Sequence, residues 1–160
     1  MKCRNATMQD VPQACHLLNE IIEIGGTTAF EKALEEEEFS SIFLTGDDCI
    51  VCIVCEDDTG IILGFQVLLH NDLLQSGWAD IATFARVSQK VRGVGTSLFN
   101  ATRQFAQSSD VPVINATIRA DNQSGLAYYT KMGFVDYHTD KAVPLNDGTP
   151  VDRISKRYDV

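Results

Sequence analysis

The sequence predicts a mixed α/β fold (an α+β arrangement) in a single domain, with helices on both faces of a mostly antiparallel sheet of six to seven strands. Its length of 160 residues suits one domain, and a hydrophobic content of 44% is enough for a sizeable core. Runs with strand and helix periodicity follow in the order β-α-α-β-β-β-α-β-α-β-β. Three consecutive strands pair most readily antiparallel, and a later strand-helix-strand unit favours one parallel pair.

The first part of the chain predicts a short strand and two helices. Residues 2–6 are expected to form the strand, and apolar residues within 8–22 recur at helical spacing. Asp10 is expected to cap the start of this helix, and Gly25-Gly26 ends it. A second helix is expected over residues 33–43.

The middle of the chain predicts three consecutive strands. The first two are expected over residues 49–55 and 61–69, joined by an Asp- and Gly-containing segment that suits a hairpin turn. The third is expected over residues 78–87. A glycine-rich turn follows this strand, and a helix is expected over residues 96–107.

The last part of the chain predicts three strands and one helix. Valine and isoleucine are frequent in residues 111–119, which favours a strand. A short helix is expected over residues 124–132, with Gly133 at its C-terminal end. Two final strands are expected over residues 134–137 and 153–160.

The composition narrows the classes of partner. A formal net charge of -9 argues against nucleic acid, because binding to a phosphate backbone needs a basic face and no Lys/Arg cluster occurs. The same charge favours a cationic substrate at long range. No apolar run has the length of a membrane span and no secretory signal is visible, so we expect no membrane partner and a cytoplasmic location.

Three cysteines, Cys49, Cys52 and Cys55, invite interpretation as a metal site. Side chains alternate between the two faces of a strand, so Cys52 is expected to point away from the other two. Thiols divided between two faces, with no second pair and no nearby histidine, do not form a closed zinc site. We therefore expect small core residues in a reducing compartment, and no metal.

The glycine-rich turn at residues 90–95, Lys-Val-Arg-Gly-Val-Gly, predicts an anion site. Glycines allow a sharp bend, and the first turn of the following helix presents unpaired N–H groups to a phosphate or pyrophosphate. A P-loop is excluded, because only one residue separates Gly93 from Gly95 and no lysine follows. A dinucleotide fingerprint is disfavoured, because Leu98 stands where a third glycine or alanine is needed.

Two segments resemble the signatures of a known family. Residues 90–95 are similar to the Arg/Gln-x-x-Gly-x-Gly/Ala signature of the GNAT superfamily of acyl-CoA-dependent N-acetyltransferases. Residues 122–134, Asn-Gln-Ser-Gly-Leu-Ala-Tyr-Tyr-Thr-Lys-Met-Gly-Phe, resemble its second signature, Asn-x-x-Ala-x-x-x-Tyr-x-x-x-Gly-Phe. Lys90 replaces the more frequent Arg or Gln, and Gly125 replaces a usual alanine. The resemblance implies one N-acetyltransferase domain over residues 1–160, with acetyl-CoA as co-substrate.

The resemblance also implies where acetyl-CoA binds. Members of the superfamily hold the pyrophosphate on the amides of the glycine turn. They splay two parallel strands apart around the pantetheine arm, and here those strands are residues 78–87 and 111–119. A backbone N–H at the end of the first strand would stabilise the developing oxyanion. The implied cofactor-binding residues are Ala85, Val87, Lys90, Val91, Arg92, Gly93, Val94, Gly95, Thr96, Asn122 and Tyr129.

The catalytic groups implied by the resemblance are an acid and a base. Tyr129 stands at the general-acid position, and a phenol with a pKa near ~10 remains protonated at neutral pH. Many relatives carry a glutamate on the strand before the glycine turn, but residues 81–87 contain no acid. Asp80 is a candidate base, directly or through water, or a strand-end residue. Glu31 and His70 are further candidates, and an amine of low pKa needs no dedicated base.

The predicted function is transfer of an acetyl group from acetyl-CoA to the primary amine of a small molecule, by direct attack in a ternary complex. Thr27, Thr28 and Phe30 follow the first helix, where relatives contact the acceptor, and their segment faintly resembles phosphinothricin-type enzymes. Arg86 is a candidate contact for an acidic ligand or part of a surface pair. The alternatives are a non-catalytic acyl-CoA-binding or sensing module and a protein N-acetyltransferase. Relatives are often dimers, so a homodimer is possible.

Overall fold

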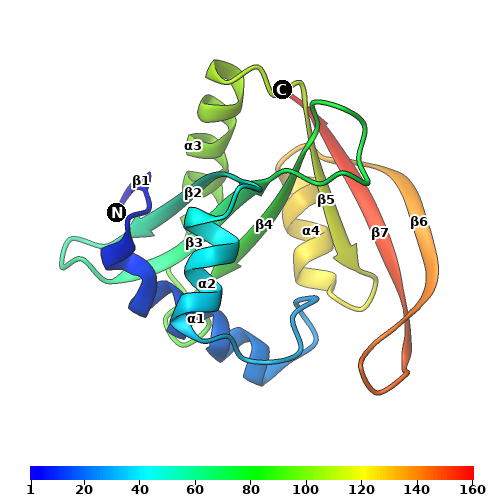
Figure 1. Ribbon diagram of the computed structural model, residues 1–160, viewed down its shortest axis with the longest axis horizontal. Helices are drawn as coiled ribbons and strands as arrows, with labels where there is room; N and C mark the ends of the chain where they lie inside the picture. Colours follow the sequence, from blue (N-terminus) through cyan, green and yellow to red (C-terminus); the bar gives the residue numbers. More distant parts are fainter.

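The computed structural model describes residues 1–160 and contains one seven-stranded sheet in the order β1-β2-β3-β4-β5-β7-β6 (Figure 1). The strands are β1 (Lys2–Asn5), β2 (Cys49–Glu56), β3 (Ile62–Leu69), β4 (Ala79–Ala85), β5 (Val113–Arg119), β6 (Val135–Pro144) and β7 (Pro150–Asp159). The helices are α1 (Val11–Ile24), α2 (Glu36–Ser40), α3 (Val94–Ser108) and α4 (Gln123–Lys131). A 3-10 turn precedes α1, and one π-helical turn follows α2.

All neighbouring strands are antiparallel except β4 and β5, which are parallel. The parallel pair is joined by α3, whereas the antiparallel neighbours β2, β3 and β4 need only short connections. The predicted fold class is therefore confirmed: a mixed, mostly antiparallel sheet with one parallel pair.

The helices cover both faces of the sheet, and each face has its own core. On one face α1 and α2 pack against β2, β3 and β4 through apolar residues that recur at helical spacing, including the fully buried Leu17 and Leu18. Phe39 and Phe43 pack there against Phe65. On the other face α3 and α4 cover the centre of the sheet. No helix is long and apolar enough to cross a membrane.

Several predicted boundaries shift by a few residues. β4 ends at Ala85 instead of residue 87, and α3 begins at Val94, two residues earlier than predicted. β5 begins at Val113, because Pro112 has no N–H group for strand pairing. The second helix begins at Glu36 instead of residue 33.

The largest difference from the sequence prediction is β6. It runs over Val135–Pro144, whereas the sequence predicted a strand over residues 134–137. Its side chains are almost all exposed, because β6 is the edge strand and neither layer of helices covers it. A strand exposed on both faces lacks the alternation of apolar and polar residues that marks a half-buried strand.

Asp10 does not cap α1 as predicted. Its backbone is already helical, and its side chain faces back along the chain, where Oδ2 accepts a hydrogen bond from the Thr7 amide at 2.7 Å. Arg4 donates to both carboxylate oxygens, and also to Glu56 on β2. The guanidinium of Arg4 lowers the pKa of Asp10. Asp10 therefore fixes the turn before α1 against β1 and β2.

The predicted orientation of the cysteines is wrong in part. Cys49 packs with the core beneath α1 and α2, on the same side as Cys52, and Cys55 packs in the core beneath α3. The register of β2 against β3 shifts between Cys49 and Val51, and this bulge interrupts the strict alternation of faces. All five cysteines are free, and no group of three or more His, Cys, Asp or Glu side chains is placed to hold a metal ion.

Candidate active site

The two parallel strands stay paired over a very short distance. β4 and β5 pair only at Ala79 with Ile114 and at Asp80 with Asn115. Figure 1 shows the strands close together at this end and diverging beyond it. On its other side β4 remains paired with β3 as far as Ala85.

The divergence leaves facing strand edges without a strand partner. We call the facing segments, residues 81–85 of β4 and 116–119 of β5, the splay. Backbone N–H and C=O groups alternate sides along a strand, so one set in each segment points toward the gap. Such edges offer hydrogen bonds to an extended ligand inserted between them.

The end of β4 shows which amides point into the splay. The Arg86 N–H donates to the carbonyl of Leu63 on β3 at 2.8 Å. By alternation, the N–H groups of Ala85 and Val87 point away from β3, toward the side where β5 has diverged. The Val87 N–H has no acceptor within the protein. This geometry is consistent with the predicted role of Ala85 and Val87 at the cofactor.

The glycine turn forms a row of free donors. Gly93 has a φ of 90°, a left-handed conformation that favours glycine, and stands directly before α3. The amides of residues 91–96 find no acceptor within the protein, and the first bond of the helix runs from the Ser97 N–H to the Gly93 carbonyl at 2.9 Å. Lys90 and Arg92 are exposed beside them. Neither side chain makes an ion pair within the protein.

Close packing fixes the position of this turn. A Cβ atom on Gly95 would lie 2.7 Å from the Tyr128 ring of α4. A Cβ atom on Gly64 of β3 would lie 2.8 Å from the carbonyl oxygen of Phe84 and 3.0 Å from the side chain of Val94. The start of α3 is therefore held at one end of the splay, where free amides and two cations suit a pyrophosphate.

Tyr129 lies beside the splay on the face that α3 and α4 cover. Its side chain is buried among Tyr128 and Phe134, and its hydroxyl is 2.8 Å from the Thr83 hydroxyl on β4. Burial raises the pKa of Tyr129 well above its ordinary value. The phenol is therefore protonated at neutral pH and stands next to the diverging edge of β4, as a general acid requires.

Asp80 lies at the closed end of the splay. Its carboxylate accepts hydrogen bonds from the Asn115 side chain at 2.7 Å and the Asn71 side chain at 3.3 Å. Burial raises the pKa of Asp80, which these two bonds oppose. Because side chains alternate along β4, Asp80 points to the opposite face of the sheet from Thr83. The candidate acid and base thus flank the splay from opposite faces.

The predicted acceptor loop after α1 reaches the far end of β5. The carbonyl of Thr28 accepts a hydrogen bond from the Arg119 guanidinium at 3.4 Å. The Thr28 side chain is buried and accepts a bond from the Phe30 amide at 3.1 Å, and the Phe30 ring packs on Phe43. Glu31 accepts a bond from the amide of Asn146, in the turn between β6 and β7.

Asn122 performs a structural task that the sequence did not indicate. Its Oδ1 accepts hydrogen bonds from the Gly125 amide at 2.9 Å and the Ser124 hydroxyl at 3.0 Å, which caps α4. Its Nδ2 donates to the carbonyl of Thr27 at 2.9 Å. A Cβ atom on Gly125 would lie 2.5 Å from that Nδ2, so the missing side chain at Gly125 leaves room for this tether.

The remaining candidates lie apart from the splay or are already paired. Arg86 donates to the carbonyl of Ile62 at 3.0 Å and lies 3.8 Å from Glu20, so it is held in a partly buried ion pair and not in an exposed surface pair. His70 is exposed in the segment after β3. Glu31 is held by Asn146.

Sequence reasoning missed three polar residues next to Tyr129: Gln66, Thr83 and Tyr128. Gln66 is fully buried, although it is the single polar side chain in β3 (Ile62–Leu69). That isolation was a usable signal, because a polar residue within a buried apolar strand needs hydrogen-bond partners.

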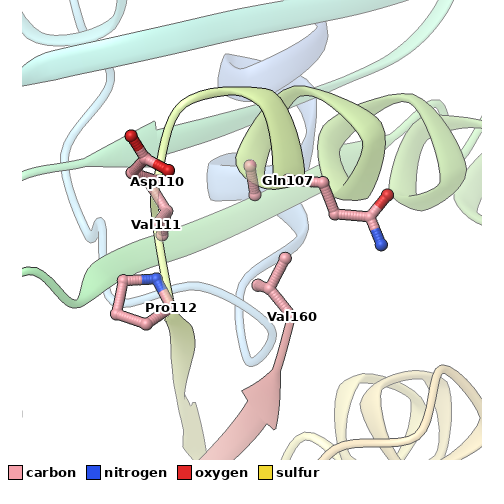
Figure 2. A pocket seen from close by; sticks show the side chains of 6 residues that line it. Gln107, Asp110, Val111, Pro112 and Val160 are labelled. Atoms are coloured by element: carbon pink, nitrogen blue, oxygen red, sulfur yellow. The ribbon is translucent and has the colours of Figure 1, made fainter.

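Two surface hollows lie away from this site. Figure 2 shows the first, of about 300 Å³, at the C-terminal end of α3, where Asp110, Pro112 and Val160 border it. That is the end of the helix opposite to Gly93. The second, of about 490 Å³, lies along α1 and is bordered by Glu20, Glu23 and Glu31 among others.

The sequence and the fold both match known proteins. The model of the acetyltransferase (GNAT) family matches residues 13–134. Among curated proteins, no match was found. Many solved structures are similar in fold.

Three of these structures illustrate the range. A ribosomal-protein-alanine N-acetyltransferase from Brucella melitensis is 20% identical, with a TM-score of 0.86 over 100% of both chains. A phosphinothricin acetyltransferase from Sinorhizobium meliloti in complex with acetyl-CoA is 19% identical, with a TM-score of 0.85 over 99% of this chain and 88% of that one. A putative acetyltransferase from Salmonella typhimurium with acetyl-CoA is 13% identical, with a TM-score of 0.83 over 99% and 92%. At these identities the likeness concerns the fold.

Proposed function

The chain belongs to the acetyltransferase (GNAT) family of acetyl-CoA-dependent transferases, and on that premise we propose that it acetylates the primary amine of a small molecule, by direct attack in a ternary complex. One observation carries the proposal. The free amides of residues 91–96 and the unpaired cations of Lys90 and Arg92 stand at one end of a splay whose edges have no strand partner. Bound there, acetyl-CoA supplies the acetyl group as an activated thioester.

The chain's own groups divide the binding task. Val91, Gly93, Val94, Gly95 and Thr96 offer amides to the pyrophosphate, and the neighbouring cations add charge that an acidic protein otherwise lacks. The N–H groups of Ala85 and Val87 face the splay, where they hydrogen-bond the extended arm and hold the oxyanion that develops during transfer. Asn122 supports this end of the site by capping α4.

Tyr129 is the proposed general acid. Its raised pKa keeps the phenol protonated, and its position beside Thr83 on the splay lets it give that proton to a departing thiolate. The proton leaves from the phenol oxygen, so the residue must be reprotonated before the next turnover.

Asp80 is the proposed general base. Its raised pKa makes the carboxylate a stronger base than an exposed aspartate, and its two asparagine partners hold it at the closed end of the splay. Because Asp80 and Tyr129 flank the splay from opposite faces, the amine and the leaving thiol exchange protons with different residues.

The acceptor loop supports a small acceptor. Thr27 and Thr28 are tied to α4 and β5, and Glu31 is tied to the β6–β7 turn. A loop anchored to α4, β5 and the β6–β7 turn stays beside the end of the splay at Arg119, and on that ground we favour a compact amine over an extended peptide. Thr27, Thr28 and Phe30 are the proposed acceptor contacts.

There are two alternatives to a small-molecule acetyltransferase. The similarity in fold to a ribosomal-protein-alanine N-acetyltransferase motivates a protein acceptor. A non-catalytic acyl-CoA-binding module would retain the glycine turn but would not need the proton chemistry of Asp80 and Tyr129.

A thiol-release assay with acetyl-CoA separates these possibilities. The panel contains small primary amines, including amino acids and diamines, and short peptides with free N-termini. We expect release above the rate without acceptor for at least one small amine, together with its acetylated product by mass. Release with peptides alone would indicate a protein acetyltransferase. Binding of acetyl-CoA with no release for any acceptor would leave the non-catalytic module.

A further inference from the structure

A continuous series of hydrogen bonds runs from the glycine turn to the phenol of Tyr129. The Tyr128 hydroxyl donates to the carbonyl of Gly95 at 2.9 Å. The side-chain amino group of Gln66 donates to the Tyr128 hydroxyl at 3.1 Å and to the Thr83 hydroxyl at 2.7 Å. The Thr83 hydroxyl is in turn 2.8 Å from the Tyr129 hydroxyl. Gln66 is fully buried beneath α3 and α4 at the centre of this chain.

The carbonyl of Gly95 determines the direction of the hydrogen bonds that Tyr128 and Gln66 make. A carbonyl oxygen only accepts, so the Tyr128 hydroxyl must donate its hydrogen to Gly95. The hydroxyl oxygen of Tyr128 then accepts a hydrogen from Gln66. Gln66 must therefore turn its amino group toward both hydroxyls. Thr83 then receives a hydrogen from Gln66, and its own hydrogen is free for the oxygen of Tyr129.

We propose that Gln66 and Thr83 are positioning residues that make Tyr129 present its proton to the splay. With its oxygen occupied by the Thr83 hydrogen, the phenol cannot donate to Thr83, and its hydrogen points outward, to a leaving thiolate. The Thr83 hydrogen also stabilises the phenolate that forms when the proton has left. The inference rests on the proposed function, because it concerns the acid of that same reaction.

The arrangement leaves one buried atom without a partner. Oε1 of Gln66 is inaccessible to solvent and accepts no hydrogen bond. An orphaned acceptor destabilises the fold, and an apolar side chain of similar shape would remove that cost. A polar residue retained here at the expense of stability indicates a role for its two donated bonds.

The hydrogen bonds extend from Tyr129 to the first turn of α3. Gly95 lies in the first turn of α3, whose amides face the proposed pyrophosphate site. Burial raises the pKa of Tyr128 to about 12, so its hydroxyl keeps the hydrogen that it donates to Gly95.

The kinetic test uses acetyl-CoA as donor and hydroxylamine as acceptor, a small nucleophile that is unprotonated at neutral pH and needs no base. Thr83→Val and Gln66→Met should each lower kcat about tenfold, part of the usual contribution of a general acid, with the KM for acetyl-CoA changed less than about twofold. Thr83→Ser restores most of the rate. Thr102→Val is the matched control, because Thr102 is also buried but takes no part in these hydrogen bonds.

The same variants are repeated with Tyr129→Phe. If Gln66 and Thr83 act through the phenol, neither substitution lowers kcat further when the phenol is absent. A further tenfold fall, or a wild-type kcat for Thr83→Val, would overturn the proposal.

Two readouts need no turnover. Gln66→Met should melt at the wild-type temperature or above, because the orphaned acceptor is gone, and a lower melting temperature would indicate a packing role only. In NMR spectra, the side-chain amide protons of Gln66 should show contacts to the Tyr128 ring and the Thr83 methyl. Their absence would mean a reversed amide and would overturn the proposal. If the wild-type protein binds acetyl-CoA but never consumes it, the proposed function fails. The melting and NMR measurements still test the hydrogen bonds among Gln66, Thr83 and Tyr128 in that case.

Discussion

At the scale of single residues, Asp80 is the proposed base in a chain that lacks a glutamate on the strand before the glycine turn. The strand before the glycine turn has no glutamate, yet Asp80 stands where β4 and β5 begin to diverge, held by two asparagines. Asn115 also accepts a hydrogen bond from Tyr137 at 2.6 Å, so β6 contributes to the same network. A carboxylate buried in this way is a better base than an exposed one.

Asp80→Asn should lower kcat about 100-fold, within the range of general-base contributions. Burial raises the pKa of Asp80 above the ordinary 3.8, so the wild-type rate should rise with pH as this carboxyl loses its proton, and that acid limb should vanish in the variant. Asp72→Asn is the control, because Asp72 is exposed nearby. An unchanged pH profile of kcat/KM would remove Asp80 from the mechanism.

Tyr129→Phe should reduce turnover about 100- to 1000-fold while the affinity for acetyl-CoA is kept, because only the proton is lost. Affinity is measured by the shift in melting temperature and turnover by thiol release. Tyr158→Phe is the control, since Tyr158 packs in the same aromatic cluster without a hydrogen bond from its hydroxyl. Equal turnover in Tyr129→Phe and wild type would contradict the acid assignment.

At the scale of elements, the glycine turn is the proposed pyrophosphate site, and its donors are mainly backbone amides. Its six free amides follow from a left-handed Gly93 before α3, and its two cations are unpaired. Replacing Lys90 and Arg92 together with glutamine should weaken acetyl-CoA binding about threefold to tenfold, by loss of charge-assisted contacts to phosphate. The effect should shrink as salt is added.

Lys131→Gln is the control for that pair, because it removes an exposed cation at the far end of α4. Dissociation constants are obtained by isothermal titration at two salt concentrations. Equal weakening by the control and the pair would show that net charge, and not the turn, governs the affinity.

The junction of β1, β2 and α1 depends on Arg4. Arg4→Met should destabilise the fold by about 1–2 kcal/mol at neutral pH, since Asp10 loses its bonds to the guanidinium. Arg4 lowers the pKa of Asp10, so this stabilisation is present above the unfolded-state pKa and is lost as pH falls through the folded-state pKa. The difference in melting temperature between wild type and variant should therefore narrow in acid, and a constant difference would contradict it.

The elements also show what a sequence can and cannot predict here. Buried strands and amphipathic helices were predictable within a few residues, because burial imposes a period on the apolar residues. The length of β6 could not be predicted, because both of its faces are exposed. The face of the sheet to which Cys49 points could not be predicted either, because the bulge in β2 depends on pairing with β3.

Some residues of the candidate site could likewise be predicted from the sequence, and others could not. The turn, Tyr129 and Asn122 were recognisable from local signatures, and Asp80 from its place at a strand end. Gln66 stands out as the single polar residue of an apolar strand, but its partners and the role of Thr83 could not be predicted, because their hydrogen bonds join residues 17 and 46 positions apart in sequence. The tether of Asn122 to Thr27 spans 95 positions and likewise depends on the whole fold.

At the scale of the whole molecule, the proposed site combines three separate parts of one sheet. The splay forms because β4 and β5 share only two residue pairs, α4 places the proposed acid on one face, and the proposed acceptor loop follows α1 on the other. The formal net charge of -9 repels a polyanion at long range, so affinity for acetyl-CoA must come from the turn itself. A homodimer and a cytoplasmic location remain predictions from sequence.

The central claim is that the glycine turn and the splay bind acetyl-CoA, and thermal melting with ligand tests it most directly. A ligand at 100 times its dissociation constant adds about 2.7 kcal/mol to a fold that binds it, which corresponds to roughly 5–10 °C for a domain of this size. We expect that shift with acetyl-CoA and with free CoA, and none with NAD. No shift with either CoA ligand, at concentrations that saturate other acyltransferases of this family, would contradict the account.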